Sequence, residues 1–117
     1  MMGRAIANLD APVTKGTSGI LLIREKGAVR KMPQRCIKCA KCVSACPMGL
    51  EPYLMAKLSR RKLWERLEAE WVTNCIECGC CQFTCPADIP LLDFIRMGKQ
   101  EVGALIRARA AAHATKK

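Results

Sequence analysis

Two groups of four cysteines are the residues of this sequence that could carry chemistry. Both groups follow the spacing Cys-x-x-Cys-x-x-Cys-x-x-x-Cys-Pro. Their members are Cys36, Cys39, Cys42 and Cys46, and Cys75, Cys78, Cys81 and Cys85. This is the bacterial-type spacing for cubane iron–sulfur clusters, and thiolate is a soft ligand that selects such metals. We therefore expect two [4Fe-4S] clusters, which mainly move single electrons.

The two groups repeat in strict register. Each cysteine of the first group lies 39 positions before its counterpart in the second, and Pro47 lies 39 positions before Pro86. The ninth cysteine, Cys80, is matched by Lys41 in the first copy. A position that holds lysine in one copy is not an obligatory ligand. We therefore expect Cys80 to be a small buried residue beside a cluster, in preference to a redox-sensing thiol.

The last cysteine of each group is expected to bind the cluster of the other group. It follows the third cysteine after a helical turn and therefore points away from its own loop, and in two-cluster ferredoxins it ligates the other cluster. Such a crossed arrangement makes cluster assembly part of folding. The expected ligand sets are Cys36, Cys39, Cys42 and Cys85 for cluster 1, and Cys75, Cys78, Cys81 and Cys46 for cluster 2. Every iron would then have a protein ligand, which disfavours Lewis-acid catalysis.

Structural zinc is the alternative explanation for the cysteines. Zinc sites commonly pair two Cys-x-x-Cys units, or combine cysteine with histidine. Here the third cysteine of each triplet and the Cys-Pro ending are surplus to that pattern. The sole histidine, His113, lies in the C-terminal tail and is expected to be a solvated residue. The spacing favours iron–sulfur clusters.

The composition bounds the class of protein. The 117 residues carry a formal charge of +10, which suits an acidic redox partner or an anionic membrane surface. Only five aromatic residues are present and the basic residues are scattered, so nucleic-acid binding is not expected. The N-terminus lacks an apolar stretch typical of a secretory signal, and Ile20–Ile23 is too short to span a bilayer. We expect a cytoplasmic domain without its own membrane anchor.

The elements around the motifs are expected to be mostly helical. Residues 1–34 form an irregular N-terminal arm in which Ile20–Ile23 could be a short strand. Residues 35–106 form an α-helical ferredoxin domain with two cluster-binding loops, and residues 107–117 form a basic, alanine-rich tail that continues a helix and then frays. Between the motifs we expect two short helices, one starting at Pro52 and one whose apolar face places Trp64 and Trp71 in the core. A longer amphipathic helix follows Pro90.

Charge differs between the two loops. Arg35, Lys38 and Lys41 flank the first triplet, whereas Glu77 lies inside the second. Because nearby charge tunes the potential of a cluster, the sequence favours a higher potential for the cluster held by the first triplet.

With these residues in view, the chain resembles the cluster-bearing part of the RnfC family, a subunit of the Rnf complex, which is an ion-translocating ferredoxin:NAD oxidoreductase. The resemblance is strongest over residues 28–101. It rests on these segments: Cys36 to Cys42 with Cys46-Pro47-Met48-Gly49-Leu50, Pro52-Tyr53-Leu54, Asn74 to Cys81, Cys85-Pro86, and Ile89-Pro90-Leu91 with the following helix. The run Pro12-Val13-Thr14-Lys15-Gly16-Thr17-Ser18-Gly19-Ile20 also resembles the segment that joins the preceding domain of RnfC to its ferredoxin domain.

The resemblance implies a role and partners. The domain would pass electrons between a flavin/NADH module and a ferredoxin-like iron–sulfur subunit, peripherally on the cytoplasmic face of the bacterial inner membrane. The portion that binds flavin mononucleotide and NADH is not found here, since no Gly-rich nucleotide loop occurs. Two alternatives stay open: a free-standing soluble ferredoxin with two [4Fe-4S] clusters, and a zinc-stabilised basic binding domain.

Overall fold

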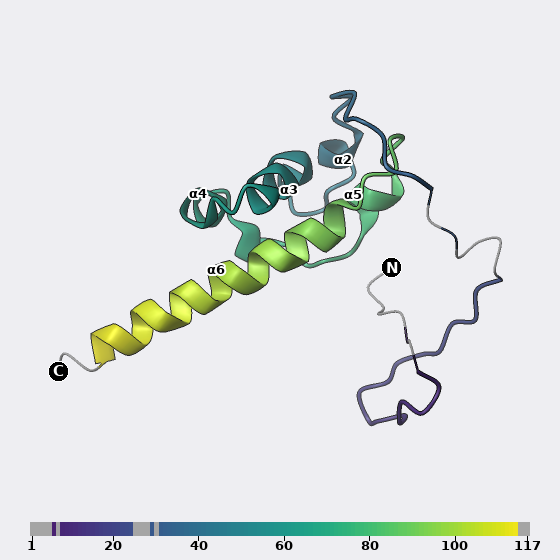
Figure 1. The fold of residues 1–117 in the computed structure, drawn as a ribbon, viewed down its shortest axis with the longest axis horizontal. Coiled ribbons are helices and arrows are strands. Elements are labelled where there is room, and N and C mark those ends of the chain that lie inside the picture. Colours follow the sequence, from purple (N-terminus) through teal and green to yellow (C-terminus); the bar gives the residue numbers. More distant parts are fainter. Residues whose placement is uncertain (1–5, 7, 25–28, 30, 115–117) are drawn as a thin grey trace.

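The computed structural model describes residues 6, 8–24, 29 and 31–114, and the regular structure of this part of the chain is all helical. The elements are α2 (Lys41–Ser44), α3 (Pro52–Arg60), α4 (Trp64–Ala69), the 3₁₀ helix η1 (Val72–Asn74), α5 (Cys80–Phe83) and α6 (Leu91–Ala114). Figure 1 shows α3 and α4 lying along one end of the long helix α6, with α2 and α5 beside that end. The helical class expected from the sequence is therefore confirmed, with about half of the chain in helices and no strand among the described residues.

The spacer between the motifs forms the two expected short helices, α3 and α4. Pro52 occupies the first position of α3, where its fixed φ suits a helix and its missing N–H costs nothing. The helix ends where Lys62 adopts a left-handed φ of 56°. There the Lys62 amide donates to the Ser59 carbonyl at 3.0 Å, and the Leu63 amide to the Leu58 carbonyl at 3.1 Å. This pair of bonds is a Schellman motif, which turns the chain sharply into α4.

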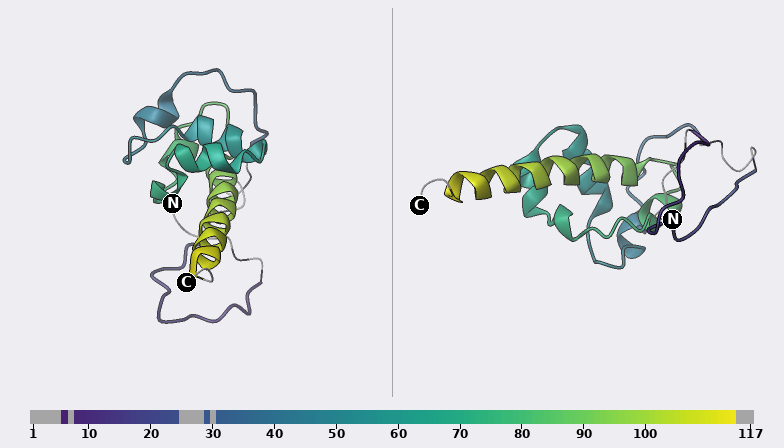
Figure 2. Two further views of the ribbon diagram at one scale, coloured as in Figure 1. Left: turned by 90° about the vertical axis from the view of Figure 1, so that its left-hand side faces the viewer. Right: turned by 90° about the horizontal axis from the view of Figure 1, so that it is seen from below.

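The core lies where α3, α4 and η1 pack against the first half of α6. Its fully buried apolar side chains are Met55, Leu67, Val72, Ile95 and Val102. Leu91, at the start of α6, is also buried. The amide of Leu92 donates to the Gln82 side-chain oxygen at 3.1 Å, so α5 caps the start of α6. The second half of α6 extends past the other helices (Figures 1 and 2), and most of its side chains are exposed; Arg109 there forms an ion pair with Glu68 of α4 at 2.8 Å.

Two sequence expectations about these elements are wrong. Ile20–Ile23 forms no strand, and its four side chains are exposed. Trp71 is 65% exposed instead of lying in the core, because α4 ends at Ala69 and Trp71 takes a left-handed φ of 57° that turns it out of the helical face. Trp64 is half-buried and packs against the core as expected.

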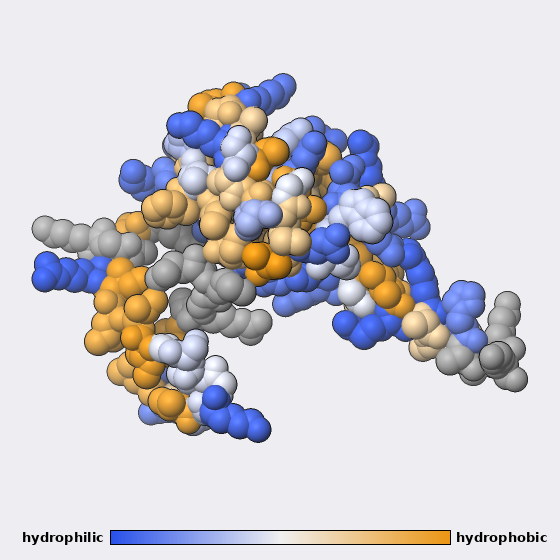
Figure 3. Space-filling model, turned by 180° about the vertical axis from the view of Figure 1, so that it is seen from behind, coloured by the Kyte–Doolittle hydropathy of each residue, from blue (hydrophilic) through white to orange (hydrophobic). Residues whose placement is uncertain are grey.

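The described part of the N-terminal arm carries no helix or strand. Its apolar side chains are exposed and stand out to one side of the body (Figure 3). The arm joins the body where the Gln34 amide donates to the Ala87 carbonyl at 2.8 Å, just after the second cysteine motif. No helix within the described ranges is long and apolar enough to cross a membrane.

Candidate iron–sulfur site

The two cysteine motifs fold into the same backbone path. The helices α2 and α5 are related by the same 39-residue offset as the cysteines and pack against each other. Left-handed φ values recur at matched positions, 56° at Lys38 and 58° at Glu77. The turn after the last cysteine repeats as well, since the amides of Gly49 and Asp88 each donate to the carbonyl three residues earlier at 3.2 Å.

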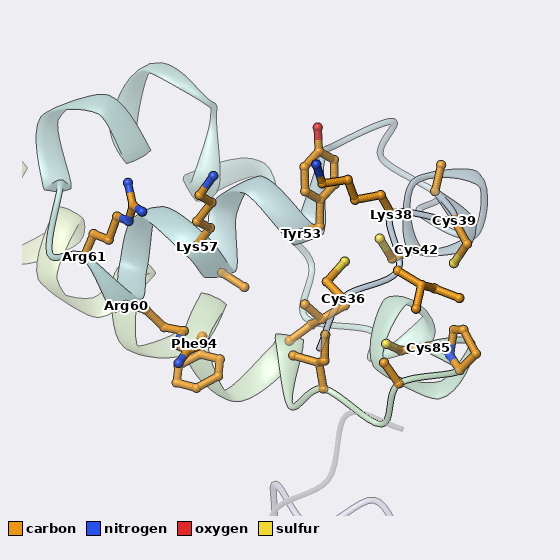
Figure 4. A pocket seen from close by; sticks show the side chains of 17 residues that line it. Cys36, Lys38, Cys39, Cys42, Tyr53, Lys57, Arg60, Arg61, Cys85 and Phe94 are labelled. Carbon is orange, nitrogen blue, oxygen red and sulfur yellow. The ribbon is translucent and has the colours of Figure 1, made fainter. Parts of the chain in front are cut away.

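Cysteines of both motifs line the larger of the two cavities that lie at the motifs. Cys36, Cys39 and Cys42 share it with Cys85 of the second motif, and its volume is about 870 Å³. Figure 4 shows Cys36, Cys42 and Cys85 directed toward the same space, with Cys39 further along the loop. Cys36 and Cys39 are exposed, whereas Cys42 and Cys85 are half-buried. The structure therefore brings together the four cysteines expected to hold cluster 1.

The remaining four predicted ligands line a second and smaller cavity. These are Cys46, Cys75, Cys78 and Cys81, around a volume of about 20 Å³. That is space for roughly one water molecule, so the side chains must move outward to hold a larger group. Cys81 is 8% exposed, and the Leu50 amide donates to the Cys46 sulfur at 3.4 Å. The second site is thus the more enclosed of the two.

Burial and hydrogen bonding set the acidities of several thiols. Burial is the largest cause of the raised pKa of Cys42 and of Cys75. Burial also raises the pKa of Cys81 to about 11, with the neighbouring Cys75 adding to the effect. The pKa of Cys78 is lowered, chiefly because the backbone amide of Cys80 bonds to its sulfur. The enclosed thiols therefore stay protonated at neutral pH until a metal displaces the proton.

Cys80 is exposed, so the expectation that it is a small buried residue is wrong. It is the first residue of α5, and its side chain points outward to hydrogen-bond the thiol of Cys78, which raises the pKa of Cys80. It lines neither cavity. Cys80 therefore lies outside both four-cysteine groups. This agrees with the first motif, where lysine, Lys41, occupies the equivalent position.

Two basic residues of α6 hold the second loop in a way that the sequence reasoning missed. Arg96 Nε lies 2.9 Å from one Glu77 carboxylate oxygen, and Lys99 Nζ lies 3.2 Å from the other. Lys99 Nζ also donates to the carbonyl of Cys75 at 2.6 Å. Burial alone would raise the pKa of Glu77, but the bonds from Lys99 and Arg96 outweigh it and lower that pKa. The 39-residue offset of the cysteines also relates Lys57 to Arg96 and Arg60 to Lys99. Extending the offset past Pro86 would therefore have singled out both cations.

The cavity lined by Cys36, Cys39, Cys42 and Cys85 has basic side chains along its rim. Lys38, Lys57, Arg60 and Arg61 line it, and none of the described residues that line it is acidic. The Arg60 guanidinium lies over the ring of Phe94 at 5.2 Å, which fixes that side chain through a cation–π contact. Figure 4 shows these basic side chains along α3 and on the loop of Lys38.

The donor chemistry fits iron–sulfur clusters. Each cavity is lined by four cysteines, and sulfur is the ligand type that such clusters use. Among the residues that the structure describes, no three Cys, His, Asp or Glu side chains converge closely enough to hold a single metal ion.

Comparison with known proteins agrees with this chemistry. A family model described as a 4Fe-4S dicluster domain matches residues 28–86, which is half of the chain. The C-subunit of the Na⁺-translocating ferredoxin:NAD⁺ oxidoreductase complex of Acetobacterium woodii is 43% identical over 102 residues, covering 87% of this chain and 23% of that protein.

Two further relatives bear similar names. The C-subunit of the proton-translocating ferredoxin:NAD⁺ oxidoreductase complex of Clostridium ljungdahlii is 38% identical over 71 residues, covering 61% of this chain and 16% of that protein. The C-subunit of the ion-translocating oxidoreductase complex of Methanosarcina acetivorans is 38% identical over 102 residues, covering 87% of this chain and 23% of that protein. The chain thus spans less than a quarter of the length of these relatives. It belongs to the 4Fe-4S dicluster domain family, with two [4Fe-4S] clusters as its cofactors, and matches the ferredoxin region of RnfC.

Proposed function

We propose that the chain is an electron-transfer module of an ion-translocating redox complex. It would relay single electrons between a flavin/NADH-binding module and an iron–sulfur partner, as a peripheral part on the cytoplasmic side of the membrane. The observation that carries this proposal is the presence of two four-cysteine cavities within a chain of the dicluster family. The names of its relatives support the setting in an oxidoreductase complex.

The ligand assignment proposed is the crossed one. Cluster 1 takes Cys36, Cys39, Cys42 and Cys85, and cluster 2 takes Cys75, Cys78, Cys81 and Cys46. The lining of the two cavities supports this division, since each contains three cysteines of one motif and the last cysteine of the other. The packing of α2 against α5 supports it further, because these helices carry the loops into contact.

The clusters supply reversible one-electron chemistry, and the residues of the chain control access to it. The exposed Cys36 and Cys39 place cluster 1 at the surface, where a partner can approach. Cys81 and the apolar side chains of Leu92 and Ile95 line the second cavity and keep water from it. With four thiolates for each cubane, no iron is left open to a substrate, so the chain acts as a carrier.

Paired cysteine substitutions test both the clusters and their crossing. Cys36→Ala with Cys85→Ala removes two ligands of one cluster in the crossed assignment, so about four of about eight irons should remain. Cys36→Ala with Cys46→Ala damages both clusters and should leave far less iron. Iron and acid-labile sulfide analysis with electron paramagnetic resonance of the reduced protein gives the answer. More iron in Cys36→Ala with Cys46→Ala than in Cys36→Ala with Cys85→Ala would reject the crossed assignment. A colourless protein that contains zinc would reject the function.

A further inference from the structure

The 39-residue offset of the cysteine motifs continues into the helices that follow them. Counting 39 residues on from Lys57 and Arg60 of α3 leads to Arg96 and Lys99 of α6. Ser59 and Gly98, which are related by the same offset, meet where the two helices cross. The offset therefore relates these helices as well as the loops, and each half has a pair of cations on the helix that follows its cysteine motif.

In the second half, this pair of cations binds a carboxylate. Arg96 and Lys99 hold the two oxygens of Glu77 at 2.9 and 3.2 Å, and Glu77 is the residue between the first two cysteines of that loop. The three side chains are 25–31% exposed, so the pairs are partly shielded from water. Such pairs hold more firmly than fully exposed ones.

In the first half, the same arrangement lacks its acid. The counterpart of Glu77 is Lys38, so a third cation lines the cavity that Lys57 and Arg60 line, and Arg61 adds a fourth. Within the described residues, none of the ion pairs includes any of these four side chains, all of which are exposed. Figure 4 shows these basic side chains distributed along α3 and on the loop of Lys38, around the cavity that the exposed Cys36 and Cys39 also line.

We propose that this basic rim, formed by Lys38, Lys57, Arg60 and Arg61, is the docking surface for an acidic patch on an electron-transfer protein. A partner carboxylate takes the place beside Lys57 and Arg60 that Glu77 takes beside Arg96 and Lys99. Docking there brings the redox centre of the partner next to cluster 1, which is the cluster at the surface. This inference rests on the proposed electron-transfer function and adds the entry face and the charge of the partner.

Charge reversal on the rim tests the docking surface. The probe is a reduced, acidic, soluble two-cluster ferredoxin, and the measurement is its second-order rate of electron transfer to the oxidised holo protein in stopped flow. Lys57→Glu should lower this rate about tenfold at low ionic strength and flatten its dependence on salt, because steering by opposite charges is lost. Arg107→Glu makes the same change in net charge at an exposed residue in the second half of α6, outside the cavity, and should lower the rate less than about twofold.

A second variant supplies the missing acid from within the chain. Lys38→Glu puts a carboxylate where the second half has Glu77, and Glu77 itself shows that glutamate accepts this left-handed φ. The new carboxylate should pair with Lys57 and Arg60 and compete with the partner, so the rate should fall at least as far as with Lys57→Glu. Iron content equal to that of the unchanged protein shows that the fold is kept.

The outcomes separate the two proposals. Failure of dithionite to reduce the holo protein would reject the electron-transfer function itself. Normal reduction by dithionite, with equal rates from the ferredoxin for Lys57→Glu and Arg107→Glu, would overturn the docking surface alone. The surface would also be reassigned, to a membrane, if Lys57→Glu abolished sedimentation with vesicles of anionic phospholipid and left the ferredoxin rate unchanged.

Discussion

Gly98 of α6 and Ser59 of α3 meet at the crossing of the two helices, with no room for a side chain between them. A Cβ added to Gly98 would overlap the Ser59 hydroxyl and lie 2.5 Å from Leu67 Cδ2. Ser59 is fully buried, and its hydroxyl donates to the Met55 carbonyl at 2.9 Å. Gly98→Ala should therefore destabilise the holo protein by about 1–3 kcal/mol, seen as a lower urea midpoint in anaerobic circular dichroism.

Gly103 offers a matched control on the same helix. A Cβ there would meet only the flexible end of Arg107 at 3.5 Å. Gly103→Ala should raise the midpoint, since alanine is favoured over glycine in a helix by about 1 kcal/mol. Combining Gly98→Ala with Ser59→Gly should recover part of the loss. Equal midpoints for Gly98→Ala and Gly103→Ala would contradict the close crossing.

Lys99 should tune cluster 2. Its ammonium lies 2.6 Å from the Cys75 carbonyl and 3.2 Å from the Glu77 carboxylate. Removing this positive charge by Lys99→Gln leaves the Glu77 charge less balanced, which disfavours the added electron. The potential of cluster 2 should fall by on the order of 50 mV in an anaerobic redox titration followed by electron paramagnetic resonance.

The ion pairs of Glu77 with Arg96 and Lys99 change the charge difference between the two cysteine loops that the sequence suggested. Glu77 is offset by Arg96 and Lys99, whereas the cations of the first loop have no such partner in the described residues. Cluster 1 is still expected to have the higher potential, now because the cations on its own side form no ion pair with another described residue. The double substitution Lys38→Glu and Lys41→Glu should lower its potential, and a rise or no change would argue against that order.

Sequence reasoning recovered the parts of the fold that local patterns specify. The cysteines that the register groups together line the same cavities, Pro52 marked the start of α3, and the apolar stripe beginning at Leu91 marked α6. These features depend on the spacing of residues along the chain and on the proline ring, which fixes φ. They can therefore be predicted from one sequence without an alignment.

Other features depended on tertiary context. Trp71 has a helical spacing from Leu67, but the left-handed turn that ends α4 removes it from the core. The bonds from Arg96 and Lys99 to Glu77 link residues 19 and 22 positions apart. These residues come together only because the second cysteine loop lies against α6, and no local sequence pattern predicts that packing. Cys80 was misjudged because burial depends on the outward orientation of the first turn of α5.

Cys80 should be dispensable for cluster binding. It is exposed, it lines neither cavity, and its counterpart is Lys41. Cys80→Ser should keep about eight irons per chain and an unchanged spectrum of the reduced protein. Cys81→Ser is the control, since it alters a buried cysteine of the second cavity and should lower the iron content. Loss of half the iron from Cys80→Ser would place Cys80 among the ligands.

Cluster loading should release protons and become more favourable as the pH rises. Burial holds the pKa of Cys81 at about 11 and raises that of Cys75, so both are protonated thiols in the metal-free protein at neutral pH. Ligation requires thiolates, so each such proton must leave when the cluster binds. Affinity should therefore rise between about pH 7 and pH 9, a range in which Cys81 keeps its proton until metal displaces it.

The measurement is anaerobic reconstitution of the metal-free protein in weak buffer with a pH indicator, scored for protons released and iron bound. The variant Cys36→Ala with Cys85→Ala isolates cluster 2, to which Cys75 and Cys81 belong in the proposed assignment. Proton release that tracks iron uptake in this variant is the expected result. Iron uptake with the same affinity at both ends of the pH range, and without released protons, would show that these thiols are already ionised in the metal-free fold and that burial does not control their acidity.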